Sequence, residues 1–551
     1  MRILIFGLSL FLLLPSVVTA AKKVEPSPAE LASTHGYAYV NFPKGTTGLL
    51  SVQAIGGKGE QVMESRPDKG KNAYGAWLKA GNYKISKWGI YKWGEYPAFE
   101  IKAGRITDLG SMVPVNIGGY EVIVMPVRHQ ENATDINLAM EEYSSVLAST
   151  DTIRWSPLAP PKPFAQTMPS TGLGLIVDVL MQQERKFNKT TINDLLKSAT
   201  TNAELLRLTK TVTPPAGDEP AVDPESNLYF GADLGAVRVR RVDGSWGDIG
   251  IDTLRKISAV EYANKTLVTG SEDGFIRASN DGGATWTILK SFGAAESILD
   301  IDHEAGNWIV TTAHSVAFNN LYGTPDLLSV YIAHTEDLSD LKKSRDFQLG
   351  GKVLLNADML TGQLVRGKYY INTVHELHIF DAQTQQWKSI TPPAPISRHR
   401  VNPKTGVIAL LRSAGLASKI HISNDGGENW KLIGRPPYVL IDVQFDAMDK
   451  GYASRWNMNA MSGAWEIYSY NAAINDWKKV SEAPFNCRPM RISSEIPLLC
   501  FATNGSIYRQ KGLDWSLEFS TSDQDIAFIP SVPVPKKRIN PRLIEKKPGE
   551  R

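Results

Sequence analysis

Ser279-Asn280-Asp281-Gly282-Gly283-Ala284-Thr285-Trp286 is the stretch of this 551-residue chain that decides its fold. A second copy, Ser423-Asn424-Asp425-Gly426-Gly427-Glu428-Asn429-Trp430, begins 144 residues later (423 − 279) and departs from the pattern S-x-D-x-G-x-T-W only at Asn429. In such a turn the aspartate accepts hydrogen bonds from the turn's own N–H groups, glycine supplies a positive φ, and tryptophan packs between sheets. We therefore predict structural roles for Ser279, Asp281, Gly283, Trp286, Ser423, Asp425, Gly427 and Trp430.

Tryptophans recur along the second half of the chain at a spacing near 40 residues. They end similar units at Trp246, Trp286, Trp387, Trp430, Trp477 and Trp515. The 101-residue interval between Trp286 and Trp387 (387 − 286) leaves room for one more unit, with Phe347 as a degenerate marker. A period of this length with several short strands per unit is typical of a β-propeller. Seven markers predict seven blades over residues 213–529, and six or eight blades are the alternatives.

Two other units end in a different turn. Phe380-Asp381-Ala382 precedes Trp387, and Tyr470-Asn471-Ala472 precedes Trp477. These two units resemble kelch-type blade ends, and the two S-x-D-x-G-x-T-W copies resemble the Asp-box (BNR-repeat) β-propeller superfamily, which includes sialidases, sortilin-type receptors and photosystem assembly-factor propellers. The resemblance implies the fold. It implies no activity, because the motif is shared by members that catalyse and members that only bind.

The N-terminus predicts export. Met1-Arg2 and the apolar run Ile3–Val18 precede the small-residue cleavage pattern Val18-Thr19-Ala20, which is typical of a secretory signal peptide over residues 1–20. The run is too short to span a membrane, and no later stretch reaches ~18 apolar residues. We therefore expect a periplasmic or secreted protein without a transmembrane segment.

Three further segments lie between the signal peptide and the propeller. Residues 21–35 are rich in Lys, Pro and Ser and predict a linker. Residues 36–127 carry short strands and Gly-Asn turns and predict a β-sandwich, similar to PEGA-type or carboxypeptidase-regulatory-like accessory modules. Residues 128–212 predict a helical connecting region. Apolar residues recur there at helical spacing, at Leu173, Ile176, Val177 and Leu180. Two capping boxes begin at Thr191 and Thr201.

Residues 530–551 form a basic, proline-rich tail with the runs Lys536-Lys537-Arg538 and Lys546-Lys547. Proline at this density cannot continue a sheet, and the charges cannot be buried, so we expect disorder. A bare solvated tail is one interpretation. Electrostatic association with an anionic envelope surface is the other.

The composition excludes several classes of protein. The net charge of +3, from 60 Lys+Arg against 57 Asp+Glu, is too low for a protein that binds mainly nucleic-acid phosphates. Two cysteines exclude a multi-cysteine zinc module. Cys487 and Cys500 could form a disulfide in an oxidising compartment, with two buried free thiols as the alternative.

Candidate metal ligands do not form a convincing site. His375 and His378 would point to opposite faces of a strand and could not share an ion. Asp300, Asp302 and Glu304 resemble a calcium loop only superficially, because the remaining ligands of such a loop are missing. We expect no metal and no cofactor.

Propeller geometry predicts where a ligand would bind. In a four-stranded blade the 4→1 and 2→3 loops lie on one face, opposite the 3→4 turns that hold the two motifs. Basic and aromatic residues of three consecutive units fall on that first face: Arg398, His399, Arg412, Arg435, Arg455, Trp456 and Arg488. We predict an anion-attracting face with an aromatic ledge, suited to an acidic protein or acidic glycan. Scattered solvated arginines are the alternative.

These observations predict an exported, non-catalytic binding or assembly factor. A sialidase-like glycoside hydrolase is the alternative, but the Arg-Ile-Pro motif of sialidases is absent. Arg238 and Arg240 occupy the corresponding unit on one face of a strand, and we interpret them as surface charges. A structural envelope component is a third class that the sequence does not exclude.

Overall fold

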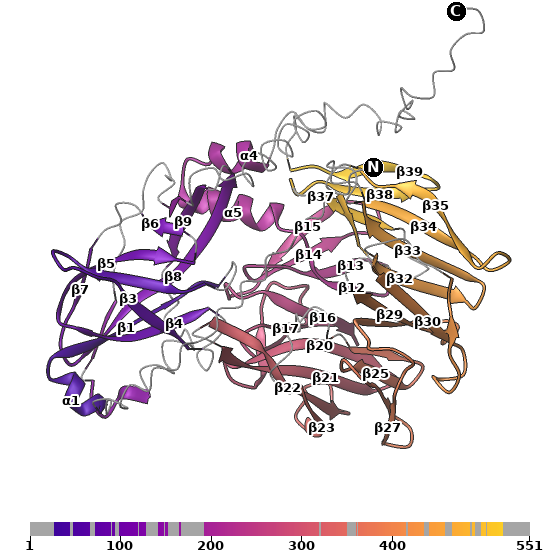
Figure 1. Ribbon diagram of the computed structural model, residues 1–551, viewed down its shortest axis with the longest axis horizontal. Helices are drawn as coiled ribbons and strands as arrows, with labels where there is room; N and C mark the ends of the chain where they lie inside the picture. Colours follow the sequence, from indigo (N-terminus) through magenta and orange to yellow (C-terminus); the bar gives the residue numbers. More distant parts are fainter. Residues whose placement is uncertain are drawn as a thin grey trace, which may run out of the picture.

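The structure is a computed structural model. It describes residues 27–43, 48–66, 72–89, 91–93, 98–118, 121–127, 142–147, 149–152, 165–166, 192–318, 321–349, 360, 362–414, 417–434, 440–457, 465–484, 487–490, 498–502 and 504–521. Figure 1 shows an N-terminal sheet, two helices beside it, and a ring of sheets. No helix among these residues is long and apolar enough to cross a membrane.

The ring consists, within the described ranges, of seven antiparallel sheets, each made of four consecutive strands. We name them blades 1 to 7. Blades 1 to 3 comprise β12 (Ala216–Val222), β13 (Leu228–Gly231), β14 (Ala236–Arg240), β15 (Trp246–Gly250); β16 (Ile257–Ala263), β17 (Thr266–Ser271), β18 (Phe275–Ser279), β19 (Thr287–Ser291); β20 (Glu296–Glu304), β21 (Asn307–Phe318), β22 (Leu321–Ala333) and β23 (Lys342–Gln348).

Blades 4 to 7 follow the same order. They comprise β24 (Gly362–Val365), β25 (Lys368–Asn372), β26 (Leu377–Asp381), β27 (Gln386–Ile390); β28 (Arg398–Val401), β29 (Ile408–Ala414), β30 (Ala417–Ser423), β31 (Lys431–Leu432); β32 (Leu440–Ala447), β33 (Lys450–Trp456), β34 (Trp465–Asn471), β35 (Asp476–Glu482); β36 (Cys487–Pro489), β37 (Leu499–Ala502), β38 (Ile507–Lys511) and β39 (Asp514–Phe519). The prediction of a seven-bladed propeller is confirmed.

The seven sequence markers all lie at the fourth strand of a blade, the six tryptophans at its start and Phe347 near its end. Each lies within the fourth strand of its blade or immediately before it, and Phe347 in β23 marks blade 3. The markers recur because each packs an aromatic ring into its own or a neighbouring blade. Phe347, for example, is buried in a cluster with Tyr369 and Phe380 of blade 4.

The ring closes where blade 7 meets blade 1. Leu228 and Phe230 of blade 1 pack against Leu499, Phe501 and Ile507 of blade 7. Within the described residues, blade 1 and blade 7 each consist of four consecutive strands, so neither blade contains a strand from the other part of the chain. The apolar contact therefore contributes to closure in this part of the chain, together with the hydrogen bonds from Arg240 and Trp246 of blade 1 to Glu518 of blade 7. The segment around residues 526–528, for which strand pairing with blade 1 was predicted, lies outside the described residues.

Within the described residues the N-terminal sheet has eleven strands. They are β1 (His35–Asn41), β2 (Leu50–Ala54), β3 (Gln61–Ser65), β4 (Ala73–Lys79), β5 (Gly81–Trp88), β6 (Tyr91–Trp93), β7 (Phe99–Ile101), β8 (Arg105–Gly118), β9 (Glu121–Val127), β10 (Ser149–Thr152) and β11 (Ala165–Gln166). Strand β1 pairs with β4 on one side and, in parallel, with β8 on the other, so the sheet curls around a core that includes Phe42, Met63 and Trp88. This part of the chain is consistent with the predicted sandwich.

Two segment predictions need correction. Residues 21–35 were predicted as a linker, yet α1 (Pro28–Ala32) and the start of β1 fall inside this range. The helix begins with a capping box, in which the Ser27 amide donates to Glu30 Oε2 (2.7 Å) and the Glu30 amide donates to Ser27 Oγ (3.4 Å). A linker-like composition therefore hid a local helix start.

Residues 128–212 were predicted as helical, but they also contain β10 and β11, which join the N-terminal sheet. The helices of this region are α4 (Ile192–Ser198) and α5 (Asn202–Val212). The Glu204 amide donates to Thr201 Oγ1 (3.1 Å), as the second capping box predicts. The helical pattern over Leu173–Leu180 and the cap at Thr191 lie outside the described residues.

Helix α5 connects the two parts of the molecule. Leu205 and Leu208 pack in one cluster with Val113 and Ile123 of the N-terminal sheet and with Leu234 of blade 1. Leu234 lies in the 2→3 loop of blade 1, so the helix rests on the face of the ring that was predicted to bind a ligand. Figure 1 shows α5 between the N-terminal sheet and the ring.

Candidate functional site

The predicted binding residues lie at one end of their blades. Arg398 begins β28, the first strand of blade 5, and Arg412 lies near the end of its second strand, β29. Arg455 and Trp456 end β33 in blade 6, and Arg488 lies in β36 of blade 7. Since first and second strands are antiparallel, these positions share the face of the 4→1 and 2→3 loops. We call it the upper face. Arg435 lies outside the described residues.

The first group on this face is engaged within the ring. Arg398 Nη1 and Arg400 Nε lie 3.7 Å and 3.3 Å from Asp442 Oδ1 of blade 6. His399 is buried, and its Nδ1 lies 2.7 Å from Asn372 Oδ1 of blade 4. These side chains connect blade 5 to both neighbours, so His399 is a packing residue rather than a surface residue.

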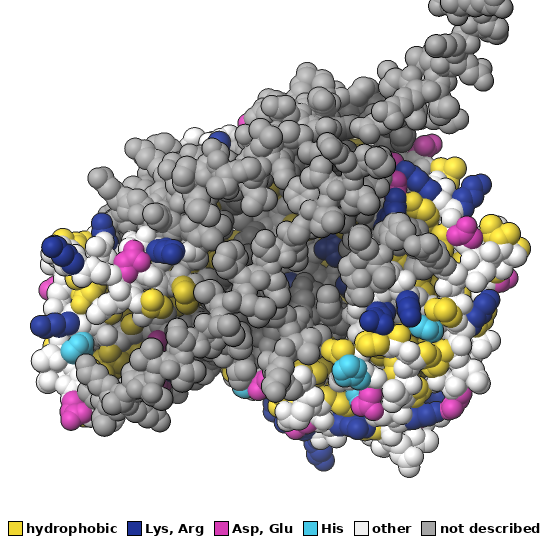
Figure 2. All heavy atoms as spheres, in the orientation of Figure 1, with side chains coloured by type: hydrophobic (Ala, Val, Ile, Leu, Met, Phe, Trp, Pro, Cys, Tyr) yellow, Lys and Arg dark blue, Asp and Glu magenta, His cyan; other side chains and the backbone are white. Residues whose placement is uncertain are grey.

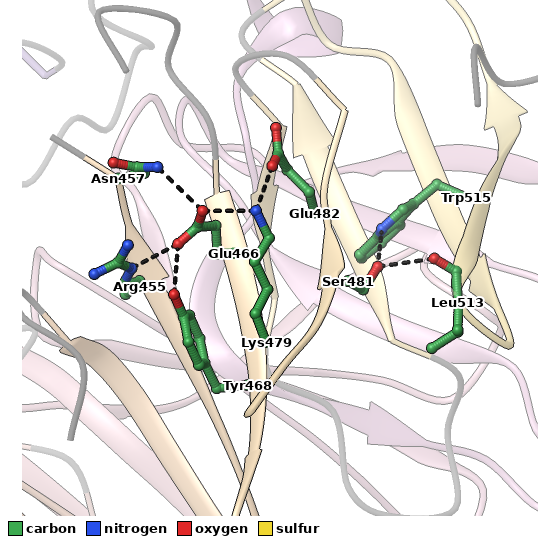
Figure 3. A network of polar contacts seen from close by, with 9 residues as sticks. All are labelled: Arg455, Asn457, Glu466, Tyr468, Lys479, Ser481, Glu482, Leu513 and Trp515. Carbon is green, nitrogen blue, oxygen red and sulfur yellow. Dashed lines mark hydrogen bonds and ion pairs between the residues drawn. The ribbon is translucent and has the colours of Figure 1, made fainter. Parts of the chain in front are cut away.

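The second group is built around a buried carboxylate in blade 6. Glu466 in β34 lies opposite Arg455 of β33 in the strand register. Its carboxylate accepts hydrogen bonds from Arg455 Nε (2.6 Å), Asn457 Nδ2 (3.0 Å), Tyr468 OH (2.8 Å) and Lys479 Nζ (2.7 Å). Figure 3 shows these four side chains converging on Glu466, Arg455 from β33, Asn457 just after it, Tyr468 from β34 and Lys479 from β35. The carboxylate therefore organises the end of the blade.

The protonation state of this cluster follows from its contacts. Burial alone would raise the pKa of Glu466, but the hydrogen bonds from Lys479, Arg455 and Tyr468 outweigh it and lower the pKa to about 2. Burial and the bond to Glu466 raise the pKa of Tyr468 to about 12. Glu466 is thus a fixed anion at neutral pH, and it holds the Arg455 guanidinium in a single orientation.

Arg455 and Trp456 form the outward edge of the cluster. The guanidinium stacks over the Tyr468 ring at 5.3 Å and uses its Nε for Glu466, while within the described residues neither terminal nitrogen has a hydrogen-bond partner. Trp456 is 41% exposed. Arg455 and Trp456 are consecutive in β33, so their side chains leave opposite faces of the strand at the upper end of the blade, where the oriented guanidinium can bind a carboxylate. We call Arg455, Trp456 and Asn457 the binding edge.

The remaining predicted residues flank this edge. Arg488 of blade 7 is exposed, and Arg412 of blade 5 is half-buried. Figure 2 shows basic, acidic and apolar side chains interspersed over the visible surface of the ring. Attraction of an anion would therefore depend on the side chains of the binding edge rather than on a large surface of positive charge.

The sequence prediction named Arg455 and Trp456, and it did not include their neighbours in the cluster: Asn457, Glu466, Tyr468 and Lys479. A signal existed, because the four donors and the carboxylate all lie within 25 residues (479 − 455 + 1). The strand register that places Arg455 opposite Glu466 cannot be seen in the sequence, because it depends on how β33 pairs with β34.

The two motif turns have the same hydrogen bonds. Ser279 Oγ donates to Asp281 Oδ1 (2.7 Å) and accepts from the Gly283 amide (2.8 Å), while Asp281 accepts from the amide and hydroxyl of Thr285 (2.9 and 2.6 Å). Ser423, Asp425, Gly427 and Asn429 repeat this set, with the Asn429 amide group replacing the hydroxyl (2.8 Å). The one departure from the motif therefore preserves its contacts.

Other blades anchor their tryptophans differently. The indole N–H groups of Trp387, Trp477 and Trp515 donate to the preceding blade, at Ser344 Oγ (2.9 Å), Gly434 O (3.3 Å) and Ser481 Oγ (3.1 Å). Trp246 of blade 1 likewise donates to Glu518 of blade 7 (3.3 Å). Within the described chain the buried indole nitrogens of Trp286 and Trp430 have no such partner.

The interpretation of Arg238 and Arg240 as surface charges is wrong. Both are buried. Arg240 makes two hydrogen bonds to Glu518 of blade 7 (2.6 and 2.9 Å), and Arg238 binds Asp248 (3.1 Å) and the Thr211 carbonyl at the end of α5 (3.1 Å). Partners from outside the unit remove these charges from solvent, which a single strand pattern could not predict.

The acidic and histidine groups considered as metal ligands have structural contacts. Asp302 accepts from the Leu364 amide (2.7 Å), and Glu304 accepts from the Gly367 amide (2.6 Å), so they connect blade 3 to blade 4. His378 is buried against Ser389, which lies 2.8 Å away, and burial lowers its pKa to about 4. Among the described residues no group of three or more His, Cys, Asp or Glu side chains could hold a metal ion.

Cys487 and Cys500 form a disulfide in the structure, with an S–S distance of 2.03 Å. They lie on the paired strands β36 and β37 and are fully buried. The bond crosses the first two strands of blade 7, which places Arg488 on a covalently constrained strand.

Comparison with known proteins adds little beyond the fold. No protein-family model matches the chain, and no curated protein matches it. YCF48 from Cyanidioschyzon merolae shares 10% identity over 54% of this chain and 95% of its own, with a TM-score of 0.40. Sqt1 of Saccharomyces cerevisiae shares 13% over 56% and 85%, with a TM-score of 0.39. A structure of YCF48 bound to D1 peptide shares 12% identity over 54% of this chain and 92% of its own, with a TM-score of 0.37.

Proposed function

We propose that this chain is an exported, non-catalytic binding or assembly factor whose upper face binds an acidic protein segment. The observation that carries the proposal is the binding edge, where Arg455 is held by Glu466 and Tyr468 at the same end of β33 as the exposed Trp456. An arginine whose orientation is already fixed loses less side-chain entropy when it binds a carboxylate.

Hydrogen-bond geometry favours a carboxylate as the ligand group. Nε of Arg455 is used by Glu466, so the two terminal nitrogens remain for a second, outer anion. That anion would face Arg488 of the neighbouring blade, which is exposed. The exposed Trp456 supplies an apolar surface at the same end of the blade, on the other face of the strand, and indole rings are common anchors of protein interfaces. An acidic residue next to an apolar or aromatic residue is the segment that fits.

A matched pair of variants on one strand tests this proposal. R455Q/W456A removes the arginine and the tryptophan of the binding edge. The control K450Q/Y452A removes a lysine and a tyrosine at the other end of β33. There, Lys450 Nζ lies 5.9 Å from the centre of the Tyr452 ring. Tyr452 is 42% exposed, close to the value for Trp456. Binding of the full chain to a glutamate- and tryptophan-containing peptide is measured by fluorescence anisotropy at low and high salt.

We expect R455Q/W456A to weaken peptide binding at least tenfold, from the loss of one charged hydrogen-bonding group and one aromatic contact at about 1 kcal/mol or more each. K450Q/Y452A should bind as the unchanged chain does, and salt should weaken binding. Equal binding by the two variants would contradict the proposal. Preference for an acidic polysaccharide would make the ligand a glycan, and turnover of a fluorogenic sialoside would favour the hydrolase alternative.

The finer assignments belong to the same proposal. Export is supported by the signal-peptide pattern of residues 1–20 and by a disulfide, which suits an oxidising compartment. Membership of the Asp-box superfamily is supported by the shared hydrogen bonds of the two motif turns. Expression with residues 1–20 fused to a reporter enzyme that is active only after export tests the first assignment. Reporter activity confined to the cytoplasm would contradict it.

A further inference from the structure

Three aliphatic side chains project from consecutive blades. Ile474, Leu513 and Val242 are 69%, 68% and 67% exposed, the highest values among the large apolar residues that the structure describes. Each lies in the 3→4 turn of its blade, in blades 6, 7 and 1 respectively. Blade 7 packs directly on blade 1, so the three turns are neighbours in the ring. We call these three residues the aliphatic tips.

The other blades differ at the same position. In blades 2 and 5 the tips are Gly282-Gly283 and Gly426-Gly427, and in blade 4 the tip is Gln383-Thr384. Leu338 in the 3→4 connection of blade 3 is buried. Among the described turns, exposed aliphatic tips are thus confined to one sector of the ring, on the rim opposite the upper face.

Hydrogen bonds hold the three turns in place. The Leu513 carbonyl accepts from Ser481 Oγ of blade 6 (2.9 Å), a contact drawn in Figure 3. The Val242 amide donates to Asn227 Oδ1 (3.1 Å). Asn475, next to Ile474, accepts from the Gly434 amide of blade 5 (2.8 Å). The apolar side chains are therefore presented on turns that need little further ordering on binding.

Charge and spacing indicate the kind of surface that these tips fit. The turn at 241–244 carries Arg241 and Asp243, and the turn at 511–514 carries Lys511 and Asp514, so each is neutral. Each aliphatic tip is the one large aliphatic side chain in its turn, although Ala472 and Ala473 precede Ile474. A protein interface normally has a contiguous apolar core, whereas a fluid lipid interface accepts separate side chains one by one.

We propose that Val242, Ile474 and Leu513 insert into the interface of a phospholipid bilayer, independently of any ligand on the upper face. The basic tail complements them. Strand β39 starts directly after Leu513 and has six residues, or about 20 Å. Lys536 lies 15 positions after Thr521 (536 − 521), and a fully extended chain of that length spans about 50 Å. The lysines can therefore attract an anionic surface to which the tips attach.

Vesicle sedimentation with the full chain tests the proposal. The variant V242S/I474S/L513S is compared with I288S/L432S, which removes two aliphatic side chains of 57% and 56% exposure from the outer strands of blades 2 and 5. The vesicles are pure phosphatidylcholine or contain phosphatidylglycerol, each at low and high salt. A chain lacking residues 530–551 is measured in parallel, and circular dichroism checks the fold of every variant.

We expect the triple variant to bind both kinds of vesicle roughly 30-fold more weakly, from roughly threefold for each partly inserted side chain. This loss should persist at high salt, while the effect of deleting the tail should appear only with phosphatidylglycerol at low salt. Peptide binding at Arg455 should be unchanged. Equal vesicle binding by the triple variant and the I288S/L432S control would overturn the proposal. So would a triple variant that changes only the oligomeric state in sedimentation velocity, since the tips would then form a protein interface.

Discussion

The 3→4 turns of blades 2 and 5 and those of blades 4 and 6 occupy the same place in the fold but are stabilised in different ways. In blades 2 and 5, Asp281 and Asp425 bind the backbone and side chains of their own turns, and Trp286 and Trp430 have no indole partner in the described chain. In blades 4 and 6 the tryptophans donate to the preceding blade.

The difference separates local from tertiary stabilisation. A turn whose hydrogen bonds are all internal needs its polar residues in one short stretch of sequence, so its motif is easy to recognise. A turn that depends on its neighbour needs only an aromatic residue at the right place, and its second half lies about 40 residues away in the chain. We expect contacts between blades to contribute more to the free energy of unfolding than the hydrogen bonds within the self-contained turns do.

The largest effect is expected at the seam of the ring. E518A leaves the buried Arg240 without the carboxylate that accepts its two hydrogen bonds and also removes the acceptor of Trp246. Leaving a buried charge unpaired costs about 3–5 kcal/mol. The free energy of unfolding in urea should fall by this amount.

The control for the seam is another cross-blade ion pair that is exposed. E428A breaks the pair between Lys388 of blade 4 and Glu428 of blade 5, which lies at the surface, and should cost no more than about 1 kcal/mol. Similar losses for E518A and E428A would mean that burial does not distinguish the two contacts.

A smaller effect is expected for the tryptophans. W387F and W477F each remove an indole N–H that donates to the preceding blade, and should destabilise the fold by about 1 kcal/mol more than W286F and W430F do. The change in ring size is the same in all four variants, so the difference reports the hydrogen bond. Urea midpoints of the four variants measure it, and equal midpoint shifts would refute the distinction between the two turn types.

The smallest effect concerns acid stability of the self-contained turns. Hydrogen bonds from Asn429 and Ser423 lower the pKa of Asp425 from 3.8 to about 2, and those from Thr285 and Ser279 lower the pKa of Asp281 further. Because the folded pKa values are depressed, this stabilisation is complete above about pH 4 and is lost as the pH falls toward 2.

Substitution tests the assignment of that acid response. In D281N/D425N, stability should be lower at neutral pH and should change less between pH 4 and pH 2 than in the unchanged chain. Urea unfolding at a series of pH values measures both. An unchanged slope would show that other carboxylates dominate the acid response.

Fold prediction succeeded where the information was local and repeated. The S-x-D-x-G-x-T-W turns and the tryptophan spacing predicted seven blades, including the one marked only by Phe347. The site was harder to predict. Arg455 and Trp456 lie where the blade geometry placed them, whereas Arg398 and His399 proved to be engaged with Asp442 and Asn372 of neighbouring blades.

The sequence by itself determined the propeller, because each blade repeats the same local pattern of strands, turn residues and aromatic markers. Only the tertiary structure decided which charges are exposed. Arg238 and Arg240 are buried because blade 7 and helix α5 supply their partners, and Arg455 is oriented because Glu466 lies opposite it across a hairpin. A single strand pattern records which face a residue takes. It does not show which partner residues of another blade or helix lie against that face, because such contacts join residues that are distant in the chain.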